Sequence, residues 1–502
     1  MNGLGAKLRR GALLLLCLPG LVTGACAWIP KGDPAAEYLE PPEIKETLAE
    51  VEQRLQQWPD DRWWEQFGNS ELNGLVETAL RDNPSLKLAS ARLREAQALV
   101  KVEGARLLPF LEADASLTYE RISQHGVFAA LNPEVAGAKI LLGVINPLSF
   151  RYEFDFWGKN RATMEAALGQ AAAEEAERAE VRLRLSTGVA RAYFRGQALR
   201  QQLDIVNTIV GIRRDLRRLA ETRYRLGLDN DQPVKLAVAD YEAAVKRQAA
   251  VRDQLDVQRN LLARLTGKGP DEARHLFAGS SVVIPEQLPV PDHLSSGLLV
   301  RRPDLAAALY RADSAARLVK VAKTQFYPTF DLTGFVGFNA LTLTKGADKL
   351  ANLLFRGQSF AYGLAPGFRL PWFEGGRLRG ELAAQRAEYD AAVELYNETV
   401  LDALREVADS LSAWQATREM LQSHKRLLAS LGEDWRLAKV RLTTGLDDDR
   451  EVLRHRHPVL EQEYVLKGLE SDQLVAAVDL IEALGGGYHN PDIDKRPKAT
   501  RG

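Results

Sequence analysis

Alternating carboxylates are the first residues of this 502-residue chain whose spacing could support chemistry. Glu112 and Asp114 alternate along one segment, and Glu153 and Asp155 alternate along another. Carboxylates of this kind can act as a general acid and base. No nucleophile–base pair and no glycine-rich phosphate loop accompanies them in the sequence. We therefore predict that the protein is not an enzyme and that these carboxylates line a water-filled space.

A second group of charged residues follows a glycine near the end of the chain. It contains Asp447, Asp448, Asp449, Glu451 and Arg454. If several copies of the chain surround one axis, each charge becomes a ring, and rings of carboxylates at a narrow pore select cations. We predict that these residues form a gate at one end of such a pore, latched by a Glu–Arg pair. The alternative is that these residues form the solvent-exposed start of a helix, where the helix dipole favours acidic side chains.

The sequence gives little evidence for a metal site, a disulfide framework or a nucleic-acid partner. His455 and His457 are two residues apart, which places them on different faces of a helix. The only cysteines, Cys17 and Cys26, are near the start, so the body has no disulfide framework. With 66 basic and 67 acidic residues, the chain lacks the basic excess that nucleic acid attracts. We predict no metal site and no cofactor.

The start of the chain has the pattern of an export signal. Basic residues precede an apolar run at 11–18, which is too short to cross a bilayer stably. Small residues then lead to Cys26, which resembles a bacterial lipoprotein signal. We predict a signal peptide over 1–25, lipidation of Cys26 and, from Ala27 by analogy with lipoproteins, sorting to the outer membrane. The alternative is ordinary cleavage after Ala25 with a free cysteine.

The elements that hold these residues occur twice, because the chain contains an internal duplication. Pro109 corresponds to Pro328, and Gly158 corresponds to Gly376. Each copy reads as helix, proline, alternating strand, loop, alternating strand, glycine, very long helix, glycine tip and helix. The predicted segments after the signal are a lipid-anchored N-terminal segment with a first helix (26–82), a first repeat (83–267), a link (268–301), a second repeat (302–487) and a disordered tail (488–502).

Four segments alternate between apolar and polar residues with a period of two. They lie at about 111–123, 147–157, 329–338 and 359–371, and each is near the length of a tilted membrane-spanning strand. Their apolar, aromatic faces would meet lipid, and their polar faces would meet water. The predicted lumen-facing residues are Glu112, Asp114, Glu120, Arg151, Glu153, Asp155, Asp331 and Arg369. The alternative is a soluble antiparallel sheet with one buried face.

Four strands cannot close a barrel, and open strand edges are not tolerated in lipid. Closure needs about eight strands or more. We therefore predict that the pore is assembled from several chains.

Two long stretches without proline follow the strands. The first runs from Gly158 to Pro233 and the second from Gly376 to Pro458, and each predicts a helix of about 65 residues, roughly 100 Å long. Apolar residues at seven-residue spacing are typical of a coiled-coil seam, and in the second copy these are Val393, Val400, Val407, Trp414 and Leu421. A soluble coiled-coil scaffold is the alternative, but it leaves the alternating strands without a purpose.

Taken together, these features resemble the TolC/OprM-type outer-membrane efflux proteins from about Trp58 to Tyr488. The landmark sequences are RWW at 62–64, LLVRRPDL at 298–305, FYP at 326–328, FEGGR at 373–377 and ALGGG at 483–487. The lipoprotein start is similar to the OprM-like branch.

The resemblance implies a mostly α-helical fold with a transmembrane β-barrel. It implies a homotrimer whose 12-stranded β-barrel continues into a 12-helix periplasmic α-barrel, lipid-anchored in the bacterial outer membrane. Its partners would be a periplasmic membrane-fusion adaptor and an inner-membrane transporter of the RND type. The adaptor would contact the hairpin tips at Arg223, Gly227, Leu228, Arg441, Gly445 and Leu446.

The implied function is a passive exit duct of a tripartite efflux pump for small amphipathic compounds. Two alternatives remain: a channel for type I protein secretion, and a lipid-anchored periplasmic scaffold without a pore.

Overall fold

The structure, a computed structural model, describes residues 29–30, 32, 35–42, 57–277, 284, 287, 295–342 and 347–494. These residues fall into two compact units, each built from separated stretches of the chain. Unit 1 includes Glu95–Ala171 and Tyr310–Val393, and unit 2 includes Ala172–Leu309 and the described residues from Glu394 onward. Each unit therefore draws on both copies of the duplication, so the copies do not form one domain each.

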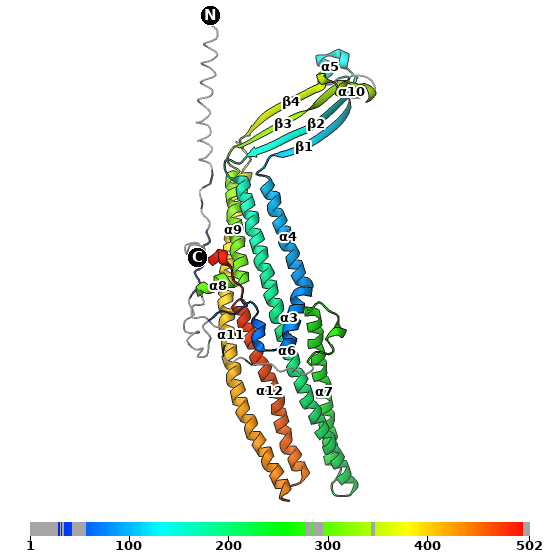
Figure 1. Cartoon of the computed structure of the whole chain (residues 1–502), viewed down its shortest axis with the longest axis vertical. Coiled ribbons are helices and arrows are strands. Elements are labelled where there is room, and N and C mark those ends of the chain that lie inside the picture. Colours follow the sequence, from blue (N-terminus) through cyan, green and yellow to red (C-terminus); the bar gives the residue numbers. More distant parts are fainter. Residues whose placement is uncertain are drawn as a thin grey trace. The chain divides into compact units, whose positions relative to one another are not determined.

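Unit 1 contains a four-stranded antiparallel sheet in the order β1-β2-β3-β4 (Figure 1). Its strands are β1 (Phe110–Arg121), β2 (Lys139–Phe154), β3 (Thr329–Thr342) and β4 (Phe360–Arg369). Among the described residues the sheet is open at both edges, because β1 and β4 each pair with one strand only.

Strand β2 begins well before the predicted start at 147. The structure accommodates the Asn146-Pro147 pair inside the strand, as an irregularity in the pairing between Ile145 and Leu148. Pro147 cannot donate to the ladder, so it is tolerated where the pairing is interrupted. The other strands begin and end within about four residues of the predicted bounds.

Short helices follow β1 and β3 at the same end of the sheet (Figure 1). They are α5 (Val127–Leu131) and η3 (Pro133–Val135) after β1, and α10 (Ala347–Leu354) and η5 (Gly357–Ser359) after β3.

Two counterpart helices lead into the sheet, α4 (Pro84–Ala105) before β1 and α9 (Pro303–Thr324) before β3. In unit 1, Val319 and Ala322 of α9 form a buried cluster with Leu382, and Ile29 packs against this cluster. Arg386 donates to the Pro30 carbonyl, and Asp390 accepts from the backbone of Ala35 and Ala36. The N-terminal segment is therefore tied to the helix that carries Leu382.

The two long helices are α6 (Lys159–Arg225) and α11 (Arg377–Thr443), each 67 residues. Both contribute residues to both units. The length agrees with the predicted ~100 Å at 1.5 Å per residue. The seven-residue seam of α11 is buried throughout, at Val393, Val400, Val407, Trp414 and Leu421.

In unit 2 the return helices are α7 (Gln232–Leu265) and α12 (Asp449–Ala483). Ile209 of α6, Ala244 of α7 and Leu460 of α12 share one buried cluster. The shorter elements are η2 (Trp63–Phe67), α3 (Ser70–Asp82), η4 (Pro270–Ala273), α8 (Ser295–Arg301) and α13 (Pro491–Asp494). Among the described helices, none combines the length and apolar character that a membrane crossing requires.

Helix α13 corrects one prediction, since it lies inside the segment expected to be a disordered tail. Asn490 donates its backbone N–H to the Val300 carbonyl, and its side chain accepts from the backbone of Asp492. Ile493 is buried. One apolar side chain and one capping asparagine therefore order this short stretch, and residues 495–502 lie outside the described chain.

Candidate functional site

The strand register places seven of the eight predicted lumen-facing residues on one face of the sheet. Residues paired across neighbouring strands share a face, and Glu153 pairs with Asp331 while Arg151 pairs with Thr333. The side chain of Asp114 accepts hydrogen bonds from Asn146 (3.1 Å) and Ser149 (2.8 Å) of β2. The seven residues are Glu112, Asp114, Glu120, Arg151, Glu153, Asp331 and Arg369.

Asp155 is the eighth, and the structure gives it a different position. Strand β2 ends at Phe154, so Asp155 lies outside the sheet. Its carboxylate accepts hydrogen bonds from the backbone N–H groups of Asn160 (3.1 Å) and Arg161 (2.9 Å). It therefore caps the N-terminus of α6, which leaves its first N–H groups without partners inside the helix.

The two hairpin tips have the same local structure. Gly227 and Gly445 have φ of 72° and 74°. Leu228 donates its N–H to the Arg223 carbonyl and Leu446 to the Arg441 carbonyl, each at 2.9 Å. This is the glycine-terminated helix end that satisfies the last carbonyls and lets the chain reverse.

Each tip also contains an arginine–aspartate pair that spans the turn. Arg223 Nε donates to Asp229 at 2.7 Å, and Arg441 Nε donates to Asp447 at 2.6 Å. The hydrogen bond from the arginine is the main reason that the pKa of each aspartate is lowered.

The leucine after each tip glycine is exposed to solvent. In this kind of helix end, that position often packs against an apolar residue near the end of the helix. Here the helix residues that the leucines would contact are Arg223 and Arg441, which are not apolar. Leu228 and Leu446 remain exposed in the chain. Two equivalent turns therefore each present an apolar side chain beside a charged pair.

The five predicted gate residues have distinct local roles. Asp447 belongs to the tip pair with Arg441, as above. Asp448 caps α12 by accepting from the backbone N–H groups of Arg450 and Glu451. Asp449 is the first residue of α12, and Glu451 pairs with Arg454 at 2.6 Å within the same helix. The acidic run is thus partly engaged in starting the helix.

The two histidines lie apart on α12, as their spacing predicts. Nδ1 of His455 lies 2.6 Å from Asp434 of α11. His457 lies near Glu461, and burial together with the charge of Arg213 lowers its pKa. The predicted lipidation site, Cys26, and the signal peptide lie outside the described residues.

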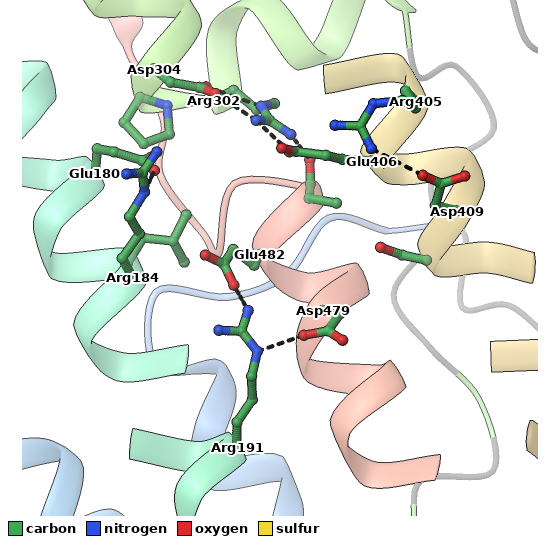
Figure 2. A pocket seen from close by; sticks show the side chains of 14 residues that line it. Glu180, Arg184, Arg191, Arg302, Asp304, Arg405, Glu406, Asp409, Asp479 and Glu482 are labelled. Atoms are coloured by element: carbon green, nitrogen blue, oxygen red, sulfur yellow. Dashed lines mark hydrogen bonds and ion pairs between the residues drawn. The ribbon is translucent and has the colours of Figure 1, made fainter. Parts of the chain in front are cut away.

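A buried arginine cluster in unit 2 was not among the predicted sites. Arg302 is 7% exposed and lies between α8 and α9. It donates to Asp304 at 3.0 and 2.5 Å, to Glu406 of α11 at 2.8 Å, and to the carbonyl of Ala483 at 2.9 Å. Figure 2 shows Arg302 directed toward Asp304 and Glu406.

Each partner of Arg302 belongs to a different structural feature. Asp304 also accepts from the N–H of Leu305, in the first turn of α9. Ala483 is the last residue of α12, whose final carbonyls have no partner inside the helix. Burial alone would lower the pKa of Arg302, but its bonds to the two carboxylates hold the pKa above its ordinary value. Arg302 therefore remains charged and joins three helices.

The cluster lines a cavity of about 340 Å³. Arg191 of α6 pairs with Asp479 and Glu482 of α12 on the same cavity (Figure 2). Glu180 pairs with Arg184 at 2.5 Å, while burial and the nearby Asp304 charge raise its pKa. Charges of both signs thus compensate one another across four helices, an arrangement suited to holding helices together.

Sequence reasoning noticed Arg302 only as part of the Arg-Arg-Pro-Asp landmark. Its partners Glu406 and Ala483 lie 104 and 181 residues further along the chain. The sequence held no local signal for these contacts, because neither the burial of Arg302 nor its need for carboxylate and carbonyl partners can be read from the neighbouring residues.

Comparisons with known proteins agree with this architecture. A model of the outer membrane efflux protein family matches residues 75–268 and 294–486, which correspond to the two copies of the duplication. The multidrug resistance outer membrane protein MdtP of Shigella flexneri is 30% identical over 501 residues, covering 97% of this chain and 99% of MdtP. MdtQ of Escherichia coli O6:H1, also named as a multidrug resistance outer membrane protein, is 30% identical over 443 residues, covering 86% and 89%.

The solved structures include a similar fold. The crystal structure of the outer membrane protein VceC from Vibrio cholerae superposes with a TM-score of 0.74 at 33% identity, covering 86% of this chain and all of VceC. The family match spans more than half of the chain, and these relatives span nearly all of it. The chain therefore belongs to the outer membrane efflux protein family.

Proposed function

We propose that this protein is the outer-membrane exit duct of a tripartite efflux pump and that three copies enclose its pore. The observation that carries the proposal is the open sheet of unit 1. Every residue of β1 is exposed, including the apolar Leu111, Leu117 and Tyr119, and both sheet edges lack a partner strand within the described chain. Such edges are not stable in lipid unless another chain completes them.

Three copies of the four-stranded sheet give a barrel of twelve strands. The apolar face, with Leu364 and Phe368 of β4 exposed, then meets lipid. The opposite face carries Asp114, Arg369 and the other charged residues and lines the lumen. The long helices and return helices of three chains form a 12-helix α-barrel in the periplasm.

The anchor proposal concerns Cys26, which carries lipid after removal of residues 1–25. The segment that follows supports it, because Pro30, Ala35 and Ala36 are hydrogen-bonded to α11. Because this segment is bonded to a long helix, the lipid must lie close to the protein. The lipid and the strands would then hold the protein in the same membrane.

The partners follow from the tips and from the relatives. MdtP and MdtQ are named as multidrug resistance outer membrane proteins, which favours small amphipathic compounds as the cargo over secreted proteins. Leu228 and Leu446 each present an apolar contact for a periplasmic adaptor, and an inner-membrane transporter of the RND type supplies the energy. The duct itself conducts passively and performs no catalysis.

Single-channel recording in planar bilayers tests the duct. We expect the purified mature protein to insert and to produce discrete conductance steps. A protein that remains a water-soluble monomer and gives no steps would rule out the duct and favour a scaffold. Ion selectivity of Asp331→Asn tests the proposed lining: the variant should become less cation-selective while insertion is unchanged.

Adaptor contact is tested by pull-down with the cognate periplasmic adaptor. Leu228→Asp and Leu446→Asp place a charge on the proposed apolar contacts and should weaken adaptor binding. Asn230→Asp is the control, because it adds the same charge to the first tip and keeps Leu228. Equal binding by the leucine variants and the parent would contradict adaptor contact at these leucines.

A further inference from the structure

Two small helices at the same end of the sheet are counterparts in the duplication but are packed differently. Helix α5 follows β1, and α10 follows β3 (Figure 1). Leu350 and Leu354 of α10 are only 4% and 7% exposed. Val127, Phe128 and Leu131 of α5 are 74%, 69% and 79% exposed. We call these three residues the α5 stripe.

Helix α10 packs against the sheet of its own chain. Its leucines share a cluster with Ala340 and Phe338 of β3 and with Ile145 of β2. Gly143 of β2 lies beneath Leu350, and a Cβ at this glycine would lie 3.1 Å from the leucine side chain. Helix α10 therefore rests on β3, the strand that precedes it, and on β2, the neighbouring strand.

The equivalent platform for α5 is incomplete. The strand that precedes it is β1, and β1 has no neighbour on its outer edge within the described chain. Tyr119 of β1 pairs with Leu141, which contacts the α10 cluster, so Tyr119 lies on the face of the sheet that α10 covers. The second half of the platform must come from whatever pairs with β1.

We propose that the α5 stripe docks across the subunit seam onto the first residues of β4 of a neighbouring copy, at Phe360 and Tyr362. Both residues are exposed, and their partners Phe338 and Val336 place them on the same face as the α10 platform. The proposal rests on the proposed oligomeric duct. It adds an apolar contact between one copy and the next, at the end of the sheet that carries α5 and α10. We call this contact the clasp.

Charge complementarity supports this seam between β1 and β4. Arg151 of β2 pairs with Thr333 of β3. Counting from Gly158 and Gly376, the counterpart of Arg151 is Arg369; counting from Pro109 and Pro328, the counterpart of Thr333 is Asp114. Applying the β2–β3 pairing to the seam therefore sets Arg369 of one copy opposite Asp114 of the next.

This pairing also fixes the direction of the two edges. Because β2 and β3 pair antiparallel, applying their pairing to the seam makes β4 antiparallel to β1, so the end of β1 at Arg121 lies near the start of β4 at Phe360 of the next copy. Helix α5 begins six residues after Arg121. The short connection keeps the α5 stripe close to the seam, where the neighbouring Phe360 and Tyr362 offer an apolar surface.

Cross-linking of the full-length protein in outer membranes tests the clasp. The double variant Leu131→Cys/Tyr362→Cys, treated with a short bis-maleimide, should convert monomer bands into dimer and trimer bands on denaturing gels. Leu131→Cys/Phe368→Cys is the matched control, since Phe368 lies on the same face at the far end of β4 and should give no oligomer bands. Each single variant controls for the native Cys26.

A third pair separates the clasp from the duct itself. Asp114→Cys/Arg369→Cys reports the seam alone and should cross-link if the sheets join as proposed. Cross-linking of this pair without cross-linking of Leu131→Cys/Tyr362→Cys would overturn the clasp and leave the duct intact, as expected if the α5 stripe faces lipid. Failure of both pairs would overturn the seam and, with it, the clasp.

Discussion

The arginine cluster around Arg302 and the two hairpin tips use the same chemistry, an arginine held by carboxylates, in opposite surroundings. Arg302 is buried and occurs once, and its partners belong to three helices. The pairs of Arg223 and Arg441 are partly exposed to solvent, occur in both copies and span only one turn each. Removing water strengthens a charge pair and makes an unpaired charge costly. The cluster therefore fixes the helix packing, whereas the tips shape a surface.

The largest expected effect is from Arg302→Met, because the variant leaves Asp304 and Glu406 without their cation. We expect a loss of about 3 kcal/mol of unfolding free energy, the lower end of the range for a broken buried pair, because Glu406 is still 44% exposed. Chemical denaturation in detergent measures it. The control is Arg405→Met on the same cavity, whose pairs with Asp402 and Asp409 are exposed and whose loss should change little. Equal losses of unfolding free energy for Arg302→Met and Arg405→Met would contradict the difference between buried and exposed pairs.

The tip glycines should give the next largest effect. Gly227→Ala and Gly445→Ala place a Cβ at positive φ, which costs about 1–2 kcal/mol. Gly211→Ala, inside α6 with open space around its Cβ position, should instead stabilise by about 0.5–1 kcal/mol. Unfolding free energies of the three variants test this. A stabilising Gly445→Ala would show that the positive φ is not required.

The proposed gate distinguishes the second tip from the first. Arg454→Ala removes the cation that pairs with Glu451 and should raise the single-channel conductance if this pair latches the closed end. The first tip lacks this Glu–Arg pair, since Pro233 and Leu236 stand at the corresponding positions after Gly227. Arg225→Ala at the first tip should therefore leave conductance unchanged. An unchanged Arg454→Ala channel would count against the latch.

The smallest effects concern pH and should have opposite signs in the two regions. Arg441 lowers the pKa of Asp447, so this stabilisation is present at neutral pH and is lost as pH falls through the lowered value. Burial and the nearby Asp304 charge raise the pKa of Glu180, so its contribution is present in acid and is lost as pH rises through the raised value.

Matched neutral variants separate these two signs in melting curves. Asp447→Asn should be less stable than the parent at neutral pH, and the difference should shrink in acid. The stability of Glu180→Gln relative to the parent should increase as pH rises. The same pH trend for both variants would show that the surroundings do not set the pKa values as described.

The sequence predicts well whatever is local or repeated. Proline-free stretches predicted α6 and α11, and paired glycines predicted both turns. The start of β2 was missed because Asn146-Pro147 signals a turn, and only pairing with β1 and β3 keeps the strand continuous there. The Arg302 cluster was missed because its contacts join residues more than a hundred positions apart. Local pattern carries no information about such partners.

The proposed duct rests on the claim that neighbouring copies complete the open four-stranded sheet. Native mass spectrometry of the mature protein, released from detergent micelles, counts the chains directly. We predict a complex of three chains, each carrying the mass of the lipid on Cys26. A single folded chain that needs no detergent to stay in solution would contradict the claim.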